Sequence, residues 1–297
     1  MPVAVVTDST AYLPADLIER YAIHVVPLYV VLAGHSGREG QDISPADVAR
    51  ALSTRGQTVS TSRPSPGDFV AAYRACLDAG ADRIVSVHLS AELSGTCDAA
   101  RLAASQVGEH LVTVLDSRST AMGAGFPVLA AARSAAAGAG AAEVCEAASA
   151  VAAATRTFFV PDTLEHLRRG GRIGAAAALL GSALAVKPLL HMQDGRVVPL
   201  EKVRTSARAL ARLVQRVTEA AGDDPVAVAV HHLAAPERAE RLAGELRERL
   251  PQLRELYVSE LGPAIGAHVG PGAIGAVVAP AGGAGQHEPD EDTPQTD

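Results

Sequence analysis

Aromatic side chains are nearly missing from this sequence of 297 residues, which contains no tryptophan, four phenylalanines and five tyrosines. Hydrophobic residues still make up 48% of the chain, so alanine, valine and leucine must supply a large core. Because the length exceeds what one hydrophobic core usually organises, we expect two domains.

Cysteines and long apolar segments are also scarce. Cys76, Cys97 and Cys145 lie far apart, and an odd, sparse set argues against a disulfide framework or a zinc site. No basic segment precedes the first apolar run, which predicts a first strand and not a signal peptide. The longest uncharged apolar run, residues 173–186, is shorter than the ~20 residues that span a bilayer. We therefore expect a soluble, cytoplasmic protein.

The chain has little excess of positive charge anywhere. Its formal net charge is −7, and five of its acidic residues lie in the last seventeen positions, which hold no lysine or arginine. A nearly neutral body without a basic stripe argues against nucleic acid binding. Residues 282–297, rich in glycine, proline and acids, are predicted to form a disordered acidic tail.

Strand-like and helix-like segments alternate through the first half of the chain. Short β-branched runs at residues 3–6, 24–32 and 83–89 alternate with segments that carry helix-start signals. This alternation predicts an α/β domain over residues 1–157, with a mostly parallel sheet and helices on both faces. Ser44 and Ser65, each followed by proline, are expected to cap helices.

The second half has a different pattern. Asp194-Gly195, between strand-like runs at 187–193 and 196–204, is a strong signal of a type I′ β-hairpin. Four helical segments are expected around it, at residues 164–169, 175–184, 206–221 and 236–250, and four further strands, at 158–160, 226–232, 256–260 and 276–279. They predict a C-terminal α+β domain, residues 158–281, with a hairpin-containing sheet.

Hydroxyl side chains cluster where strands or turns are expected to lead into helices, at residues 8–10, 61–66 and 90–96. Ligands of open α/β sheets lie beyond the carboxyl ends of the strands, and helix N-termini there favour anions. Serine and threonine more commonly cap helices. Thr61, Ser62 and the loop of Ser94 carry more hydroxyls than a cap needs, which favours a ligand at those two loops.

Residues 260–275 combine five glycines and two prolines around a single histidine, His268. Glycine and proline together predict a rigid, narrow backbone path that presents one imidazole. Residues 270–275 match Gly-x-Gly-x-x-Gly, but a strand-like run follows where a dinucleotide site needs a helix, so we reject a nucleotide site. A buried turn with an ordinary core histidine is the simpler alternative.

A serine esterase is the enzymatic alternative. Ser94 and His268, with Glu260 or Asp8 as the acid, could form a catalytic triad. A nucleophilic serine usually lies in a Gly-x-Ser-x-Gly elbow, and Glu92 stands where the first glycine is needed. A neutral histidine beside hydroxyl groups can equally well hold a carboxylate.

Three arginines, Arg168, Arg169 and Arg172, surround the helix break at Gly170-Gly171. Guanidinium groups suit the recognition of carboxylate or phosphate. A solvated helix end, where cations are favourable, explains the cluster equally well.

Six motifs, taken together and in order, resemble the DegV family, and within it the fatty acid-binding subunits of bacterial fatty acid kinase. Each motif alone is weak, but the set is specific and spans about residues 3–280. The motifs are Thr7-Asp8-Ser9-Thr10, Thr61-Ser62 with Pro64-Ser65, Leu93-Ser94-Gly95-Thr96, Arg169-Gly170-Gly171-Arg172-Ile173, Lys187-Pro188, and Gly266-Ala267-His268 with Gly270-Pro271-Gly272.

The resemblance implies a two-domain fold with a long-chain fatty acid buried between the domains. Arg169 and Arg172 would line the carboxylate end or the surface that docks the kinase. The scarcity of aromatic residues suits an acyl tunnel with aliphatic walls. The residues that match the carboxylate-binding groups are Thr61, Ser62, Ser94 and His268.

The same resemblance implies that the subunit catalyses no reaction itself and needs no cofactor or metal. It would present the acid to a separate ATP-dependent kinase, whose acyl phosphate product passes on towards phospholipid synthesis. Peripheral contact with a membrane during lipid exchange belongs to the same expectation. Arg63 departs from the resemblance, because a more neutral residue is expected there.

Overall fold

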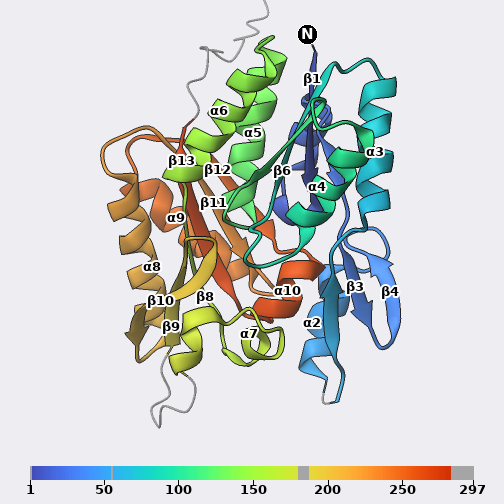
Figure 1. Ribbon diagram of the computed structural model, residues 1–297. Helices are drawn as coiled ribbons and strands as arrows, with labels where there is room; N and C mark the ends of the chain where they lie inside the picture. The colour runs from blue at the N-terminus through green and yellow to red at the C-terminus, as the bar shows by residue number, and fades with distance from the viewer. Residues whose placement is uncertain (1, 55, 180–186, 282–297) are drawn as a thin grey trace, which may run out of the picture.

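The computed structural model describes residues 2–54, 56–179 and 187–281 of the chain (Figure 1). The predicted acidic tail, residues 282–297, lies outside the described residues, as does the second half of the helix expected at 175–184.

The first sheet has four parallel strands in the order β2-β1-β6-β7. Both faces of this sheet are covered. Its strands are therefore short runs of β-branched residues and lack the alternation of polar and apolar residues that is typical of a half-exposed sheet. The strands are β1 (Val3–Asp8), β2 (His24–Val26), β6 (Arg83–His88) and β7 (Val112–Asp116).

Helices cover both faces of this sheet. On one face α3 (Pro66–Asp78) and α4 (Thr96–Val107) pack against side chains such as Val6 and Ile84. On the other, α5 (Met122–Ala136) and α6 (Ala141–Ala154) pack against Val5 and Val85, beside α1 (Ala15–Arg20). The predicted parallel sheet with helices on both faces is confirmed.

The second sheet has six strands in the order β10-β9-β8-β13-β11-β12 and is mixed, because only β11 and β12 run parallel. Asp194 and Gly195 both have positive φ, 51° and 77°, as a type I′ turn requires, so the predicted hairpin is confirmed. The strands are β8 (Arg156–Val160), β9 (Lys187–Gln193), β10 (Arg196–Val203), β11 (Val226–His232), β12 (Leu253–Glu260) and β13 (Ile274–Pro280).

The pair α5 and α6 lies between the two sheets (Figure 1). One core cluster joins this pair to Val85 of the first sheet and to Ala229 and Val277 of the second. Helices α8 (Ser206–Ala221) and α9 (Pro236–Arg249) cover the opposite face of the second sheet. The predicted boundary between residues 157 and 158 falls within β8, and the division into domains stays a prediction.

A third, small antiparallel sheet has the order β4-β3-β5 and was not expected. The single strand expected at residues 24–32 is divided at Pro27 into β2 and β3 (Tyr29–Leu32), since proline offers no N–H for a ladder. The sheet is completed by β4 (His35–Arg38) and β5 (Val59–Ser62). Thr61 and Ser62 therefore lie at the end of a strand and not in a loop.

Helices α2 (Pro45–Ser53) and α10 (Pro263–Val269) cover this small sheet, with Val30, Val48 and Ala267 in a shared core cluster. The expected caps Ser44 and Ser65 are confirmed, each in a capping box. Part of the rigid backbone path expected through residues 260–275 is the helix α10, which was not predicted. Proline at its first position and Gly270, with φ 77° after its last, supply start and stop signals.

Three short elements complete the described chain: η1 (Ser9–Ala11), α7 (Glu165–Arg169) and η2 (Gly174–Leu179). None of the helices in the described ranges is both long and apolar enough to cross a membrane.

Candidate functional site

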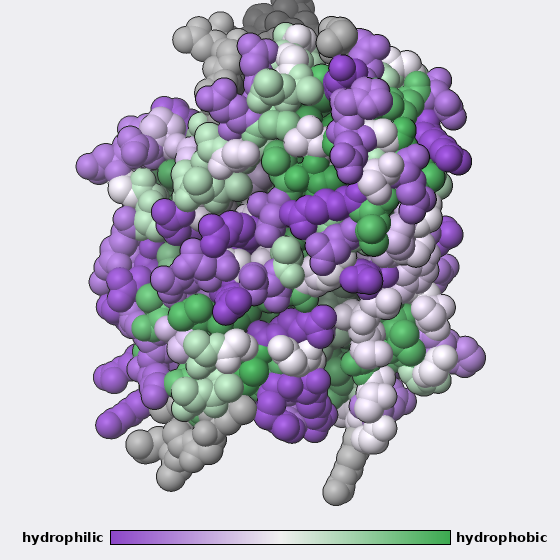
Figure 2. All heavy atoms as spheres, viewed as in Figure 1, coloured by the Kyte–Doolittle hydropathy of each residue, from purple (hydrophilic) through white to green (hydrophobic). Residues whose placement is uncertain are grey.

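A largely apolar cavity lies where the three sheets approach one another, and it encloses about 970 Å³ including its open mouth. On the face drawn in Figure 2, hydrophobic residues are interspersed with hydrophilic ones. The large hydrophobic side chains that are exposed in the described chain are those of Val25 and Leu102. The apolar walls include Leu89, Phe158, Phe159, Ile265, Ile274 and Val277.

The polar part of the cavity wall centres on Thr61 and His268, which are 207 positions apart in the chain. The Oγ1 atom of Thr61, at the end of β5, lies 2.9 Å from Nε2 of His268, in the last turn of α10. Both side chains line the cavity. The hydrogen bond therefore joins the small sheet to the C-terminal segment at the cavity wall.

His268 is neutral at physiological pH. Burial, and secondarily the positive charge of Arg172, lowers the pKa of its imidazole to about 4. Its Nδ1 atom is buried and has no hydrogen-bond partner among the described residues. A neutral imidazole carries one N–H, and a buried donor without an acceptor is costly, so the hydrogen-bond pattern assigns the proton to Nε2. With Nε2 donating to Thr61, the threonine hydroxyl keeps its own proton for a ligand.

Ser94 and Ser62 also line the cavity. Ser94 Oγ lies 2.8 Å from Oγ1 of the buried Thr96. The loop that carries Ser94 is held at its start, where Ser90 Oγ donates to the carbonyl oxygen of Gly195 in the hairpin at 2.7 Å. Ser62 is exposed at the mouth. The structure thus brings the four residues expected to bind a carboxylate to one cavity, and that role stays a prediction.

The two expected arginines separate. Arg172 lines the cavity, with Nε donating to the carbonyl oxygen of Leu93 at 3.0 Å and Nη1 to that of Gly170 at 2.6 Å. Arg169 is 64% exposed and forms an ion pair with Glu165. Of the pair, Arg172 can reach a ligand in the cavity, whereas Arg169 is available only to a molecule outside it.

A further arginine, the exposed Arg63, also lines the cavity. Its Nη1 atom lies over Gly95, where an added Cβ would be only 2.0 Å away. In the sequence, Arg63 stood out only because the family resemblance suggests a more neutral residue at this position. In the structure it adds a second guanidinium group beside Ser94.

Two histidine–glycine pairs join α7 to α10. A Cβ on Gly170 would lie 2.1 Å from Nδ1 of His268, and a Cβ on Gly270 would lie 2.1 Å from Cδ2 of His166. Each helix thus presents a ring to a bare glycine of the other segment. The sequence indicated Gly170 only as a helix break. The need for a residue without a side chain at this position depends on His268, which lies almost a hundred residues away in the chain.

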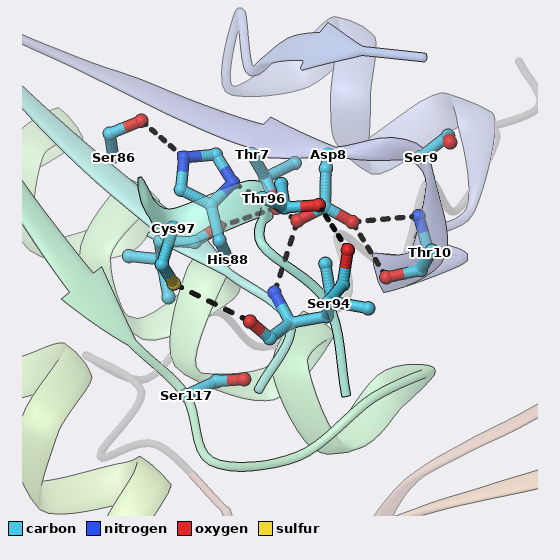
Figure 3. A network of polar contacts seen from close by, with 12 residues as sticks. Thr7, Asp8, Ser9, Thr10, Ser86, His88, Ser94, Thr96, Cys97 and Ser117 are labelled. Atoms are coloured by element: carbon cyan, nitrogen blue, oxygen red, sulfur yellow. Dashed lines mark hydrogen bonds and ion pairs between the residues drawn. The ribbon is translucent and has the colours of Figure 1, made fainter. Parts of the chain in front are cut away.

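The hydroxyl segment at residues 8–10 does not contribute to the cavity wall. Asp8 is 1% exposed, and its carboxylate accepts hydrogen bonds from Thr10 Oγ1 at 2.6 Å and from the backbone N–H of Leu89 at 3.0 Å (Figure 3). His88 Nδ1 lies 3.0 Å from the same carboxylate. Asp8 therefore fixes the strand end from which the Ser94 loop departs.

The esterase triad expected as the alternative does not assemble. The hydrogen bond of His268 goes to Thr61 and that of Ser94 to Thr96, while Asp8 bonds His88. Glu260 accepts from the backbone N–H of Ala234. Within the described residues, Ser86, His88 and Asp8 do follow the hydrogen-bond order of a triad, but all three are at most 1% exposed, and none of them lines the cavity.

His231 is a cavity residue that the sequence did not indicate. Burial lowers its pKa to about 4, and its Nε2 accepts a hydrogen bond from the N–H of Met122 at 3.2 Å. The ring is thus neutral, and Nδ1 is left to donate to Ser259 Oγ at 3.0 Å. No cluster of three or more metal-ligating side chains is found in the described part of the chain.

Comparison with known proteins gives consistent matches over nearly the whole chain. The model of the DegV family of uncharacterised proteins matches residues 2–281. A DegV domain-containing protein of Streptomyces coelicolor is 55% identical over 276 residues, which cover 93% of this chain and 98% of the relative.

Two solved structures are similar to the fold. One, from Thermus thermophilus, is described as a DegV family protein with fatty acid binding; it has a TM-score of 0.90 and 34% identity and covers 95% of this chain and 100% of its own. The other, DegV from Bacillus subtilis, is described as a fatty acid binding protein; it has a TM-score of 0.86 and 35% identity over the same shares.

Proposed function

This chain belongs to the DegV family, and from that premise we propose that it binds a long-chain fatty acid in the cavity and presents the carboxylate to a separate fatty acid kinase. The observation that carries the proposal is the neutral His268 bonded to Thr61 on the wall of a largely apolar cavity. The fatty acid binding described for two structural relatives supports it.

The carboxylate would be held mainly by hydroxyl donors. Thr61 keeps a proton for the ligand because it accepts from Nε2 of His268. Ser94 does the same when the buried Thr96 donates to it. Burying a carboxylate is costly unless its oxygens are hydrogen-bonded, and the two hydroxyls supply part of those hydrogen bonds. His268 acts through Thr61, and Ser62 is a further donor at the mouth.

The guanidinium group of Arg172 supplies the charge complement. A guanidinium carries five N–H donors, and two of those of Arg172 are used by backbone carbonyl groups. The remaining donors can meet a carboxylate oxygen. The apolar walls then take the acyl chain, since aliphatic and aromatic surfaces favour hydrocarbon over water.

The kinase step follows from the chemistry of a carboxylate. One carboxylate oxygen would attack the terminal phosphorus of ATP held by the kinase; the new C–O–P linkage forms as the bond to ADP breaks. The exposed Arg168 and Arg169 on α7 offer a basic docking surface. Access to an acyl chain in a membrane during exchange would use the same open mouth.

The direct test is organic extraction of the purified protein followed by mass spectrometry, together with titration of the lipid-free protein with oleate. We expect a long-chain fatty acid to co-purify. Ser94→Ala removes one hydrogen bond to a charged group, which costs about 1.5–3 kcal/mol, and His268→Ala removes the partner that orients the hydroxyl of Thr61 towards the ligand, so each should weaken oleate binding about tenfold or more.

Both variants should remain folded in a thermal unfolding assay, and Ser105→Ala on the outer face of α4 is the matched control. Equal lipid content in the parent, Ser94→Ala and His268→Ala proteins would show that the carboxylate is held elsewhere. The kinase step is tested by adding ATP and the kinase and trapping acyl phosphate with hydroxylamine; product without kinase would contradict the proposal.

A further inference from the structure

Helix α10, which carries His268, begins without a cap from its own segment. Its N-cap residue is Gly262, which has no side chain to accept a hydrogen bond, and Pro263 follows. The first N–H groups of a helix have no partner within it, so each must be satisfied from outside when the helix start is buried. Ala264 is 2% exposed.

The missing cap is supplied by residues from the beginning of the chain. The N–H of Ala264 donates to Glu39 Oε1 at 2.7 Å, and that of Ile265 donates to the hydroxyl of Tyr12 at 3.2 Å. Tyr12 in turn donates to Glu39 Oε1 at 2.9 Å, and the hydroxyl of Ser9 donates to Oε2. Glu39 is the centre of this network.

Glu39 is buried, with 5% of its surface exposed. Burial raises the pKa of its carboxyl group, and the hydrogen bonds from Ser9, Ala264 and Tyr12 oppose that rise. The fit around it is close: a Cβ on Gly262 would lie 2.6 Å from Glu39 Oε1 and 2.4 Å from Cε1 of Tyr12. A buried acid with three donors is a built contact, because an unpaired carboxylate there would be strongly unfavourable.

The backbone of Glu39 belongs to the sheet that carries Thr61. Its N–H donates to the carbonyl oxygen of Leu28 at 2.8 Å, directly after β4. In that sheet Val30 is paired with Gly37 on one side and with Thr61 on the other. One residue therefore connects the strand system of Thr61 to the start of the helix of His268.

We propose that Glu39 is a positioning residue of the lipid site: by capping α10 from the small sheet, it sets the place of His268 relative to Thr61. Ala264 and His268 are four residues apart, about 6 Å along the helix, so a change at the capped end is transmitted to the imidazole. The inference rests on the proposed function for its binding readout, but its structural readout is independent of lipid.

A double-mutant cycle tests whether Glu39 acts through His268. Oleate affinity is measured for lipid-free parent, Glu39→Ala, His268→Ala and the double variant. We expect Glu39→Ala to weaken oleate binding about tenfold in the parent and less than about twofold in the His268→Ala background. An equal loss in both backgrounds would overturn the proposal, since it would mean a general structural role.

A conservative variant and a matched control complete the binding test. Glu39→Gln keeps an oxygen that can accept from Ala264, so its affinity should fall between those of the parent and Glu39→Ala. If Glu39→Ala does not fold, the cycle is run with Glu39→Gln. The matched control is Glu143→Ala, which removes an exposed acid that caps α6 through the N–H of Gly140.

The independent readout is the ¹⁵N NMR signal of the His268 ring in lipid-free protein. Glu39→Ala should shift it away from the pattern of a neutral ring protonated at Nε2, whereas Glu143→Ala should leave it unchanged. An unchanged ring signal in Glu39→Ala would overturn the positioning role even where oleate affinity falls. If the parent binds no oleate, the proposed function fails while this ring signal still decides the role of Glu39.

Discussion

Gly170 is the position where one added methyl group would most directly disturb the site. A Cβ atom there would lie 2.1 Å from Nδ1 and 2.7 Å from Cε1 of His268, whereas ordinary contacts begin at 3.4 Å. The imidazole would have to withdraw by about 1.3 Å, the difference between 3.4 and 2.1 Å. The 2.9 Å hydrogen bond to Thr61 would not survive such a shift unchanged.

The backbone itself tolerates alanine at position 170. Its φ of −75° and ψ of −9° lie in the right-handed helical region, where Gly→Ala usually stabilises a protein by about 0.4–1 kcal/mol. Binding should nevertheless weaken, because the loss of one hydrogen bond to a charged ligand costs about 1.5–3 kcal/mol. That range corresponds to roughly tenfold to a hundredfold weaker oleate binding.

The assay is calorimetric titration of lipid-free Gly170→Ala protein with oleate, alongside thermal unfolding. Gly244→Ala is the matched control, since this glycine also lies in a helix, α9, and a Cβ there would meet nothing within 4 Å. The control should bind oleate like the parent. Parent affinity in Gly170→Ala, with the protein folded, would refute the role of His268 in holding Thr61 at the ligand.

Two further predictions concern charge. The pKa values of His231 and His268 are lowered to about 4 in the folded protein, so the stability from keeping these rings neutral is present above about pH 6.5 and is lost as the pH falls towards 4. Each ring should contribute up to about 3 kcal/mol to the change in the free energy of unfolding between pH 6.5 and 4. His231→Gln or His268→Gln should therefore make that free energy less dependent on pH in this range. A pH dependence as steep as the parent's would contradict the argument that burial keeps these rings neutral. Arg172→Gln should weaken oleate binding about tenfold and raise the pKa of His268 in an NMR titration. Arg169→Gln alters an exposed side chain, so it should leave oleate binding and the pKa of His268 unchanged. It should lower only the kinase-dependent formation of acyl phosphate. Equal effects of the two substitutions would contradict the separation of these arginines.

Features with local causes were predictable from the sequence. The caps at Ser44 and Ser65 and the turn at Asp194-Gly195 depend on a few neighbouring residues, and the structure has them where they were expected. The alternation of β-branched and helical segments was enough to predict the parallel sheet, because burial of both faces leaves that pattern in the sequence.

Features with distant causes were not predictable. Helix α10 has seven residues, two of which are the helix breakers Pro263 and Gly266, and it is held by Glu39 and Tyr12 from the other end of the chain. Short helices owe their stability mainly to tertiary contacts, so the start and stop signals of α10 do not by themselves predict a helix. The need for Gly170 and the separation of Arg169 from Arg172 likewise depend on the fold.

The strand order of the second sheet has a consequence for how the protein matures. The last strand of the described residues, β13, lies in the middle of that sheet, between β8 and β11, so the sheet is divided until residue 280 has been synthesised. A chain is synthesised at about 5–20 residues per second, and its N-terminal part generally folds first. The cavity gains its central wall and His268 only from residues 263–280, so the proposed lipid site would be complete only once that segment has been synthesised. A truncation that removes β13 should therefore give a protein that exposes sheet edges to aggregation.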